Sequence, residues 1–125
     1  AHFDIKDKDV VILGCGPIGL MAVDVSRAFG AKKIIAIETK AYRRSLALEL
    51  GADVVINPLE EDVIEEVLIH TNRKGADVIG EFSGSRDAIQ KAFKYIKAGG
   101  GFSMLGLPSQ NIEVDFVMVG LTLKK

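Results

Sequence analysis

The sequence predicts an α/β domain built on a parallel sheet, because short apolar runs alternate along the chain with segments of helical periodicity. Strands of a parallel sheet are buried on both faces and therefore read as continuous apolar runs. Such runs occur at residues 10–13, 33–37, 53–56, 77–79 and 101–105, with a last candidate at 121–123. We expect a doubly wound sheet of about six strands with helices on both faces.

Helical segments lie between these runs, with apolar residues at three- and four-residue spacing in residues 18–29, 46–50, 63–68 and 88–96. A glycine at positive φ ends a helix at little cost, and glycines stand at the expected helix-to-strand joints: Gly30, Gly51, Gly75 and Gly99. Segments 51–56 and 75–79 are near copies, which indicates one kind of joint used twice. The third helix is expected to begin at Asn57 as N-cap, with Pro58 in its first turn.

The composition fits a single domain spanning residues 1–125. Charged residues make up 26% and the net charge is −1, so no basic surface for nucleic acid is expected. With one cysteine and no apolar segment of membrane-spanning length, we expect no internal disulfide framework, no membrane span and a cytoplasmic location. The mean hydropathy of +0.23 is high for a small domain. Part of the apolar surface is therefore expected to face a partner or another domain.

A Gly-x-Gly-x-x-Gly motif follows the first apolar run directly and consists of Gly14, Gly16 and Gly19. Gly14 suits the tight turn out of the strand, Gly16 lets the backbone approach a pyrophosphate, and Gly19 lets the next helix pack closely on the sheet. Pro17 and Ile18 stand in the first helical turn, whose N–H groups and dipole favour an anion. Between a strand and a helix, this motif predicts a dinucleotide-binding site on a Rossmann sheet.

An acidic residue, Glu38, follows 19 positions after the last glycine of the motif, at the end of the second apolar run. A carboxylate there can accept hydrogen bonds from both ribose hydroxyls and would repel a 2′-phosphate, which favours NAD over NADP. Arg43 and Arg44 lie close in the sequence and complicate this preference, or they are ordinary cations of a helix surface. We expect NAD as the cofactor, with Glu38 on its adenosine ribose.

Two further loops follow the fourth and fifth apolar runs, and ligands of parallel sheets bind where the strands end. Contacts with the nicotinamide end of the cofactor are expected from these loops, at Phe82, Ser83 and Gly84 and at Leu105, Gly106 and Leu107. The alternative for each loop is a plain turn without a ligand.

No catalytic or metal-binding group of residues is expected in this sequence. His2 stands near the start, His70 stands near the end of a helical segment, and Cys15 is the variable residue of the glycine motif. One cysteine and two distant histidines do not supply a zinc site. The chain is therefore expected to bind a cofactor without carrying out chemistry.

These motifs together resemble the coenzyme domain of the zinc-containing medium-chain alcohol dehydrogenases, most of all the L-threonine 3-dehydrogenase and sorbitol dehydrogenase branch. The resemblance covers roughly residues 8–124 and rests on the glycine motif, on Glu38 followed by Arg43, and on segments 51–58, 81–84 and 105–107. It implies that Arg43 lies beside the adenine and that segments 82–84 and 105–107 line the nicotinamide ribose. It also implies a parent enzyme that oxidises a small alcohol by hydride transfer to NAD, aided by a catalytic zinc.

The zinc ligands of that family lie in a catalytic domain that this sequence does not contain. We therefore expect a part of a longer dehydrogenase, able to bind NAD but not to turn over an alcohol. Segment 121–125 is expected to form a last strand through which a homo-oligomer could pair. Two other functions stay open: a stand-alone nucleotide-binding regulatory module, and an S-adenosylmethionine-dependent methyltransferase-like domain, whose ligand has no pyrophosphate for the glycine loop.

Overall fold

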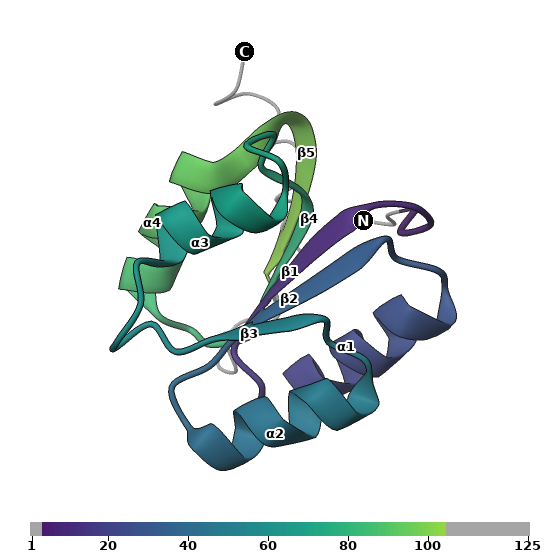
Figure 1. Cartoon of the computed structure of the whole chain (residues 1–125), viewed down its shortest axis with the longest axis vertical. Coiled ribbons are helices and arrows are strands. Elements are labelled where there is room, and N and C mark those ends of the chain that lie inside the picture. The colour runs from purple at the N-terminus through teal and green to yellow at the C-terminus, as the bar shows by residue number, and fades with distance from the viewer. Residues whose placement is uncertain (1–3, 105–125) are drawn as a thin grey trace.

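The computed structural model describes residues 4–104 and shows one parallel sheet between two layers of helices (Figure 1). The elements follow in the order β1 (Asp9–Leu13), α1 (Pro17–Ala28), β2 (Lys33–Ile37), α2 (Ala41–Leu50), β3 (Val54–Ile56), α3 (Val63–His70), β4 (Ala76–Glu81), α4 (Arg86–Tyr95) and β5 (Ile96–Met104). The predicted α/β class is confirmed, with five strands in the described part. The sixth candidate, at 121–123, and its proposed role in pairing lie outside the described residues.

Helices cover both faces of the sheet, as expected: α1 and α2 lie on one face, and α3 and α4 lie on the other (Figure 1). The alternation of side chains along β1 makes both faces apolar. Val11 and Leu13 pack in a core with residues of α3 and α4, whereas Val10 and Ile12 pack in a second core with residues of α1 and α2. A strand buried on both sides reads as the continuous apolar run seen in the sequence.

The order of the strands, β3-β2-β1-β4-β5, positions the functional site. The chain first builds outward from β1 through β2 to β3, then returns to the other side of β1 for β4 and β5. The loops after β1 and β4 therefore leave the sheet toward opposite faces and open a crevice at the carboxyl ends of the strands. Ligands of such sheets bind at this switch point.

The two similar segments at 51–56 and 75–79 form the same joint, as predicted. In each, the aspartate accepts a hydrogen bond from the first part of the neighbouring strand: Asp53 from the N–H of Ile34, and Asp77 from the N–H of Asp9, both at 2.8 Å. Each aspartate also pairs with a cation, Arg27 at 2.6 Å in the first joint and Lys97 at 3.2 Å in the second. These carboxylates tie the amino-terminal edge of the sheet together.

Two predicted boundaries were wrong. Helix α3 begins at Val63 with Asp62 as its N-cap, because residues 57–61 close into a turn through bonds of their own, including Leu59 N–H to Asn57 Oδ1 at 3.1 Å. Strand β5 begins at Ile96, directly after α4, rather than at 101. Gly99, expected to end a helix, lies within β5 with φ +81°, next to the irregular register between β4 and β5.

The apolar stripe of α1 faces away from the sheet. Ile18, Met21, Val25 and Phe29 are between 44% and 67% exposed, whereas Gly19, Val23 and Ser26 are buried. The small side of the helix packs on the sheet because Gly19 lies against the carbonyl of Gly14, which leaves no room for a larger residue. Among residues 4–104, no helix is long and apolar enough to cross a membrane.

Candidate dinucleotide-binding site

The three glycines of the motif meet three different surroundings. Gly14 has φ +89°, and a Cβ there would lie 2.8 Å from the backbone of Ser83. A Cβ on Gly19 would lie 1.9 Å from the carbonyl oxygen of Gly14, so only glycine permits this approach of α1 to the turn. A Cβ on Gly16 would meet nothing within 4 Å. Two glycines are thus required by the fold itself, and Gly16 borders open space.

That open space lies at the amino end of α1. Gly16 is the N-cap, and no side chain caps the helix, whose first turn begins with Pro17. Leu20 is the first residue whose N–H bonds back to the N-cap carbonyl, at 2.9 Å. The N–H groups of Ile18 and Gly19 precede it in the first turn, where no helical carbonyl lies four residues earlier to accept them. The bare turn, with its positive dipole end, suits an anion such as a pyrophosphate.

Glu38 joins the glycine loop to the loop after β2. Its carboxylate accepts the N–H of Cys15 at 2.7 Å and the N–H of Lys40 at 2.9 Å. Burial would raise the pKa of Glu38, but these bonds and the nearby Arg43 outweigh it and hold the pKa below its ordinary value. Glu38 is therefore ionised near neutral pH. It holds the two loops together and also lines the cavity at the carboxyl ends of the strands.

The two arginines of α2 have different roles. Arg44 donates from its guanidinium to the carbonyl of Glu38 at 3.0 Å and to that of Thr39 at 2.7 Å. Arg43 lies 5.5 Å from the ring centroid of Tyr42, and its charge lowers the pKa of Glu38. Arg44 thus fixes the loop after β2, and Arg43 is the cation beside the carboxylate.

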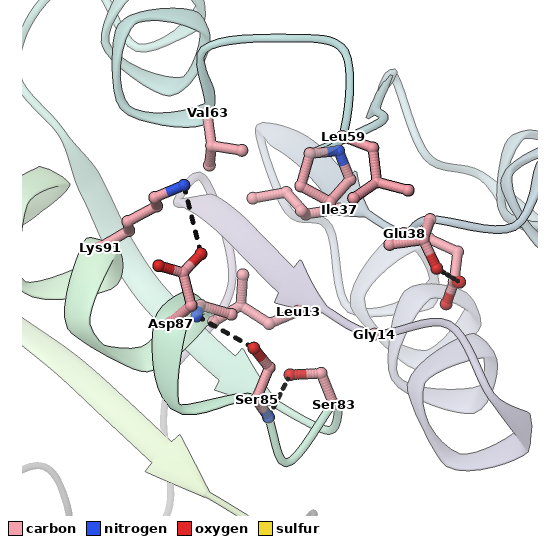
Figure 2. Close-up of a pocket in the computed structure, with 13 residues that line it drawn as sticks. Leu13, Gly14, Ile37, Glu38, Leu59, Val63, Ser83, Ser85, Asp87 and Lys91 are labelled. Atoms are coloured by element: carbon pink, nitrogen blue, oxygen red, sulfur yellow. Dashed lines mark hydrogen bonds and ion pairs between the residues drawn. The ribbon is translucent and has the colours of Figure 1, made fainter.

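A cavity of about 220 Å³ opens at the carboxyl ends of the strands (Figure 2). Its wall comes from the ends of β1 and β2, from the loops after β1, β2, β3 and β4, and from α3 and α4. The lining residues are Leu13, Gly14, Ile37, Glu38, Thr39, Pro58, Leu59, Val63, Ser83, Ser85, Asp87, Ala88 and Lys91. Figure 2 shows Glu38 at one end of this cavity and the ion pair of Asp87 with Lys91, at 3.2 Å, at the other. The middle is largely apolar, so the cavity suits a flat apolar ring joined to a polar group.

The structure brings some predicted site residues together and separates others. Gly14, Glu38 and Ser83 line the cavity, and Ser83 lies beside Ser85, apart from Glu38 (Figure 2). The contact of Ser83 with a nicotinamide stays a prediction. Phe82 packs in the core beside α1 and α2. Gly84 is exposed at φ +67° and donates its N–H to Glu81. The predicted residues Leu105, Gly106 and Leu107 lie outside the described residues.

Sequence reasoning missed the apolar wall opposite Ser83, formed by Pro58, Leu59 and Val63. Leu59 is 78% exposed although it borders the cavity. Pro58 and Leu59 follow a parallel strand, so their position alone could have placed them at the ligand edge. The sequence pattern instead predicts the start of a helix at this segment.

Of the three residues considered for chemistry, His70 and Cys15 are engaged elsewhere, and His2 lies outside the described residues. His70 is the last residue of α3, as expected, and its Nε2 lies 3.7 Å from Glu66. Cys15 is fully buried, and burial together with the carboxylate of Glu38 raises the pKa of its thiol to about 12. Within residues 4–104, no three His, Cys, Asp or Glu side chains are grouped to hold a metal ion.

Comparisons with known proteins agree with this geometry. A family described as zinc-binding dehydrogenase matches residues 17–125. The chain belongs to this zinc-binding dehydrogenase family. Its relatives include the L-threonine 3-dehydrogenases of Caldanaerobacter subterraneus subsp. tengcongensis, 45% identical over 97% of this chain and 36% of that protein, and of Pyrococcus furiosus, 43% identical over 90% of this chain and 32% of that protein. The branch expected from the motifs is thereby confirmed.

Solved structures of this dehydrogenase family share the fold. An alcohol dehydrogenase from Thermus sp. ATN1 superposes with a TM-score of 0.78 at 33% identity, over 85% of this chain and 30% of that one. A zinc-binding dehydrogenase from Sinorhizobium meliloti 1021, described as bound to NADP, superposes with a TM-score of 0.81 at 30% identity, over 97% and 36%. This zinc-binding dehydrogenase chain spans about a third of the length of the relatives it matches.

Proposed function

We propose that this domain binds NAD as the cofactor domain of a zinc-dependent dehydrogenase that oxidises a small alcohol. The observation that carries the proposal is the open space at Gly16, at the uncapped end of α1, two residues after Gly14, which lines the cavity together with Glu38. A pyrophosphate fits the N–H groups of that turn, and a Cβ at Gly16 would occupy its place. The ribose and adenine of the same cofactor then extend into the cavity.

The residues of this chain bind and orient the cofactor. The turn at Gly16 and Pro17 holds the pyrophosphate, Glu38 accepts from the ribose hydroxyls, and the apolar wall of Ile37, Pro58 and Leu59 covers the adenine. NAD supplies a hydride acceptor to the reaction of the full-length enzyme. In the longer relatives the remaining two-thirds of the chain has room for a zinc site and a substrate pocket. The identity of the alcohol follows from that part, with the threonine dehydrogenases as the leading guide.

NAD rather than NADP is the second part of the proposal. Glu38 stays ionised near neutral pH, and its oxygens stand at the ribose end of the cavity, where a 2′-phosphate would meet a like charge. A relative with the same fold is described as bound to NADP, so the fold by itself leaves both cofactors open. The preference therefore depends on Glu38 and its neighbour Arg43. A cytoplasmic location stays a prediction that accompanies this cofactor.

The test is calorimetric titration of the chain with NAD, NADP and S-adenosylmethionine, using Glu38→Gln and the surface variant Glu49→Gln as a matched control. We expect saturable binding of NAD, weaker binding of NADP and none of S-adenosylmethionine. Glu38→Gln should lose about tenfold of the preference for NAD, since one charge repulsion is removed, and Glu49→Gln should keep it. Binding of S-adenosylmethionine without NAD would overturn the proposal, and an unchanged preference in Glu38→Gln would overturn the role of Glu38.

A further inference from the structure

Glu81 is a fully buried carboxylate at the end of β4, directly beside Leu13 at the end of β1. A buried charge is costly unless hydrogen bonds compensate it. The carboxylate accepts the Ser83 hydroxyl at 2.5 Å, the Gly84 N–H at 2.6 Å and the Ser83 N–H at 3.2 Å. These three bonds all go forward, to the loop between β4 and α4.

That loop forms one side of the cofactor cavity. The hydroxyl of Ser83 also accepts the N–H of Ser85 at 3.0 Å, and the hydroxyl of Ser85 caps α4 by accepting the N–H of Ala88 at 3.2 Å. Hydrogen bonds thus run from Glu81 through Ser83 to the first turn of α4. Both serines line the cavity.

The same loop lies against the glycine motif. The Ser83 backbone is so close to Gly14 that a Cβ on Gly14 would come within 2.8 Å of it, and the Phe82 N–H donates to the Leu13 carbonyl at 2.7 Å. A shift of the loop would therefore displace the turn that leads to Gly16. Glu81 itself does not line the cavity.

We propose that Glu81 is a positioning residue of the cofactor site: its buried carboxylate holds the β4–α4 loop against the glycine loop without contacting the cofactor. This inference rests on the proposed binding of NAD. In Glu81→Gln the side-chain amide has one accepting oxygen in place of two, and its NH₂ group faces the donors of Ser83 or Gly84. The β4–α4 loop then shifts, and with it move its side of the cavity and its contact with the glycine loop.

The experiment compares the wild-type chain with Glu81→Gln and with Asp53→Asn. Asp53 is a matched control because it also accepts a backbone N–H, that of Ile34, but at the opposite edge of the sheet. We measure Tm and NAD affinity by calorimetry at a temperature where each variant is folded. Both variants should unfold at lower temperature. Glu81→Gln alone should bind NAD about tenfold more weakly, which corresponds to about 1.4 kcal/mol.

The outcomes separate the two proposals. If the wild-type chain does not bind NAD, the proposed function fails and this inference fails with it. If the wild type binds but Glu81→Gln binds equally well, or if Asp53→Asn loses as much affinity, only the positioning role is overturned. If Glu81→Gln does not fold, Glu81→Asp decides, because it keeps the carboxylate but withdraws it from the N–H groups of Ser83 and Gly84 and leaves every residue that lines the cavity unchanged. Weaker NAD binding by folded Glu81→Asp supports the inference, and unchanged binding overturns it.

Discussion

Gly19 is closely packed and Gly16 borders open space, so alanine at each position separates an effect on folding from an effect on NAD binding. In Gly19→Ala the new Cβ would lie 1.9 Å from the Gly14 carbonyl oxygen, so α1 must retreat by about 1 Å to reach even the closest contacts seen in proteins. Overpacking of this kind costs about 3 kcal/mol. For a chain of this size, that lowers Tm by about 10 °C.

In Gly16→Ala the new Cβ enters open space, and φ of −70° suits alanine. Loss of a glycine N-cap costs less than about 1 kcal/mol, so the chain should fold almost as well as the wild type. The same Cβ occupies the proposed place of the pyrophosphate. NAD affinity should therefore fall by at least about tenfold, equivalent to about 1.4 kcal/mol.

Thermal unfolding and NAD titration of both variants check this pair. The expected pattern is a lower Tm for Gly19→Ala and a lower NAD affinity with nearly unchanged Tm for Gly16→Ala. Wild-type affinity in Gly16→Ala would refute the placement of the pyrophosphate over this turn. A wild-type Tm in Gly19→Ala would refute the close packing of α1 on the Gly14 carbonyl.

Three further predictions concern single side chains. The hydroxyl of Tyr95 is buried without a hydrogen-bond partner among residues 4–104. Tyr95→Phe should therefore raise the free energy of unfolding, measured by urea titration, by about 1 kcal/mol. A lower free energy of unfolding in this variant would show that the hydroxyl is hydrogen-bonded. The pKa of Glu38 is lowered in the folded chain, so its stabilisation is complete above about pH 4.3 and is lost as the pH falls through the lowered value. The stability difference between wild type and Glu38→Gln should therefore shrink from pH 6 to pH 3; a constant difference contradicts this. With its thiol pKa raised to about 12, Cys15 should react with iodoacetamide at pH 8 far more slowly than in the urea-unfolded chain, and equal rates would contradict its burial.

The strands and the glycine turn could be predicted because their signals are local. β1 and β2 match apolar runs at 10–13 and 33–37 within one residue, since each strand is buried on both faces. The roles of Gly14 and Gly19 followed from the spacing, and their surroundings agree with those roles. The position of Glu38 beside the glycine loop followed from parallel strands that end at one edge.

The boundaries that failed were decided by competing contacts. Asn57 and Pro58 carry the signals of a helix start, but Asn57 closes a turn with Leu59. The helix begins only after Asp62, which is its N-cap. Gly99 has the signal of a helix end, whereas it lies in β5 where the pairing with β4 is irregular. In both cases the local pattern allowed two structures, and neighbouring groups selected one.

The sequence by itself determined the parallel α/β sheet, the glycine turn after its first strand and the family, because these depend on periodicity and on residues a few positions apart. Only the tertiary structure decided which face of α1 is buried, which apolar residues wall the cavity, and that Glu81 holds the loop on which Ser83 stands. Those features join segments up to about 70 residues apart, through bonds such as that from the Phe82 N–H to the Leu13 carbonyl. Such contacts form because the sheet brings together the ends of strands that are far apart in the sequence. A local sequence pattern does not show which distant residues will meet.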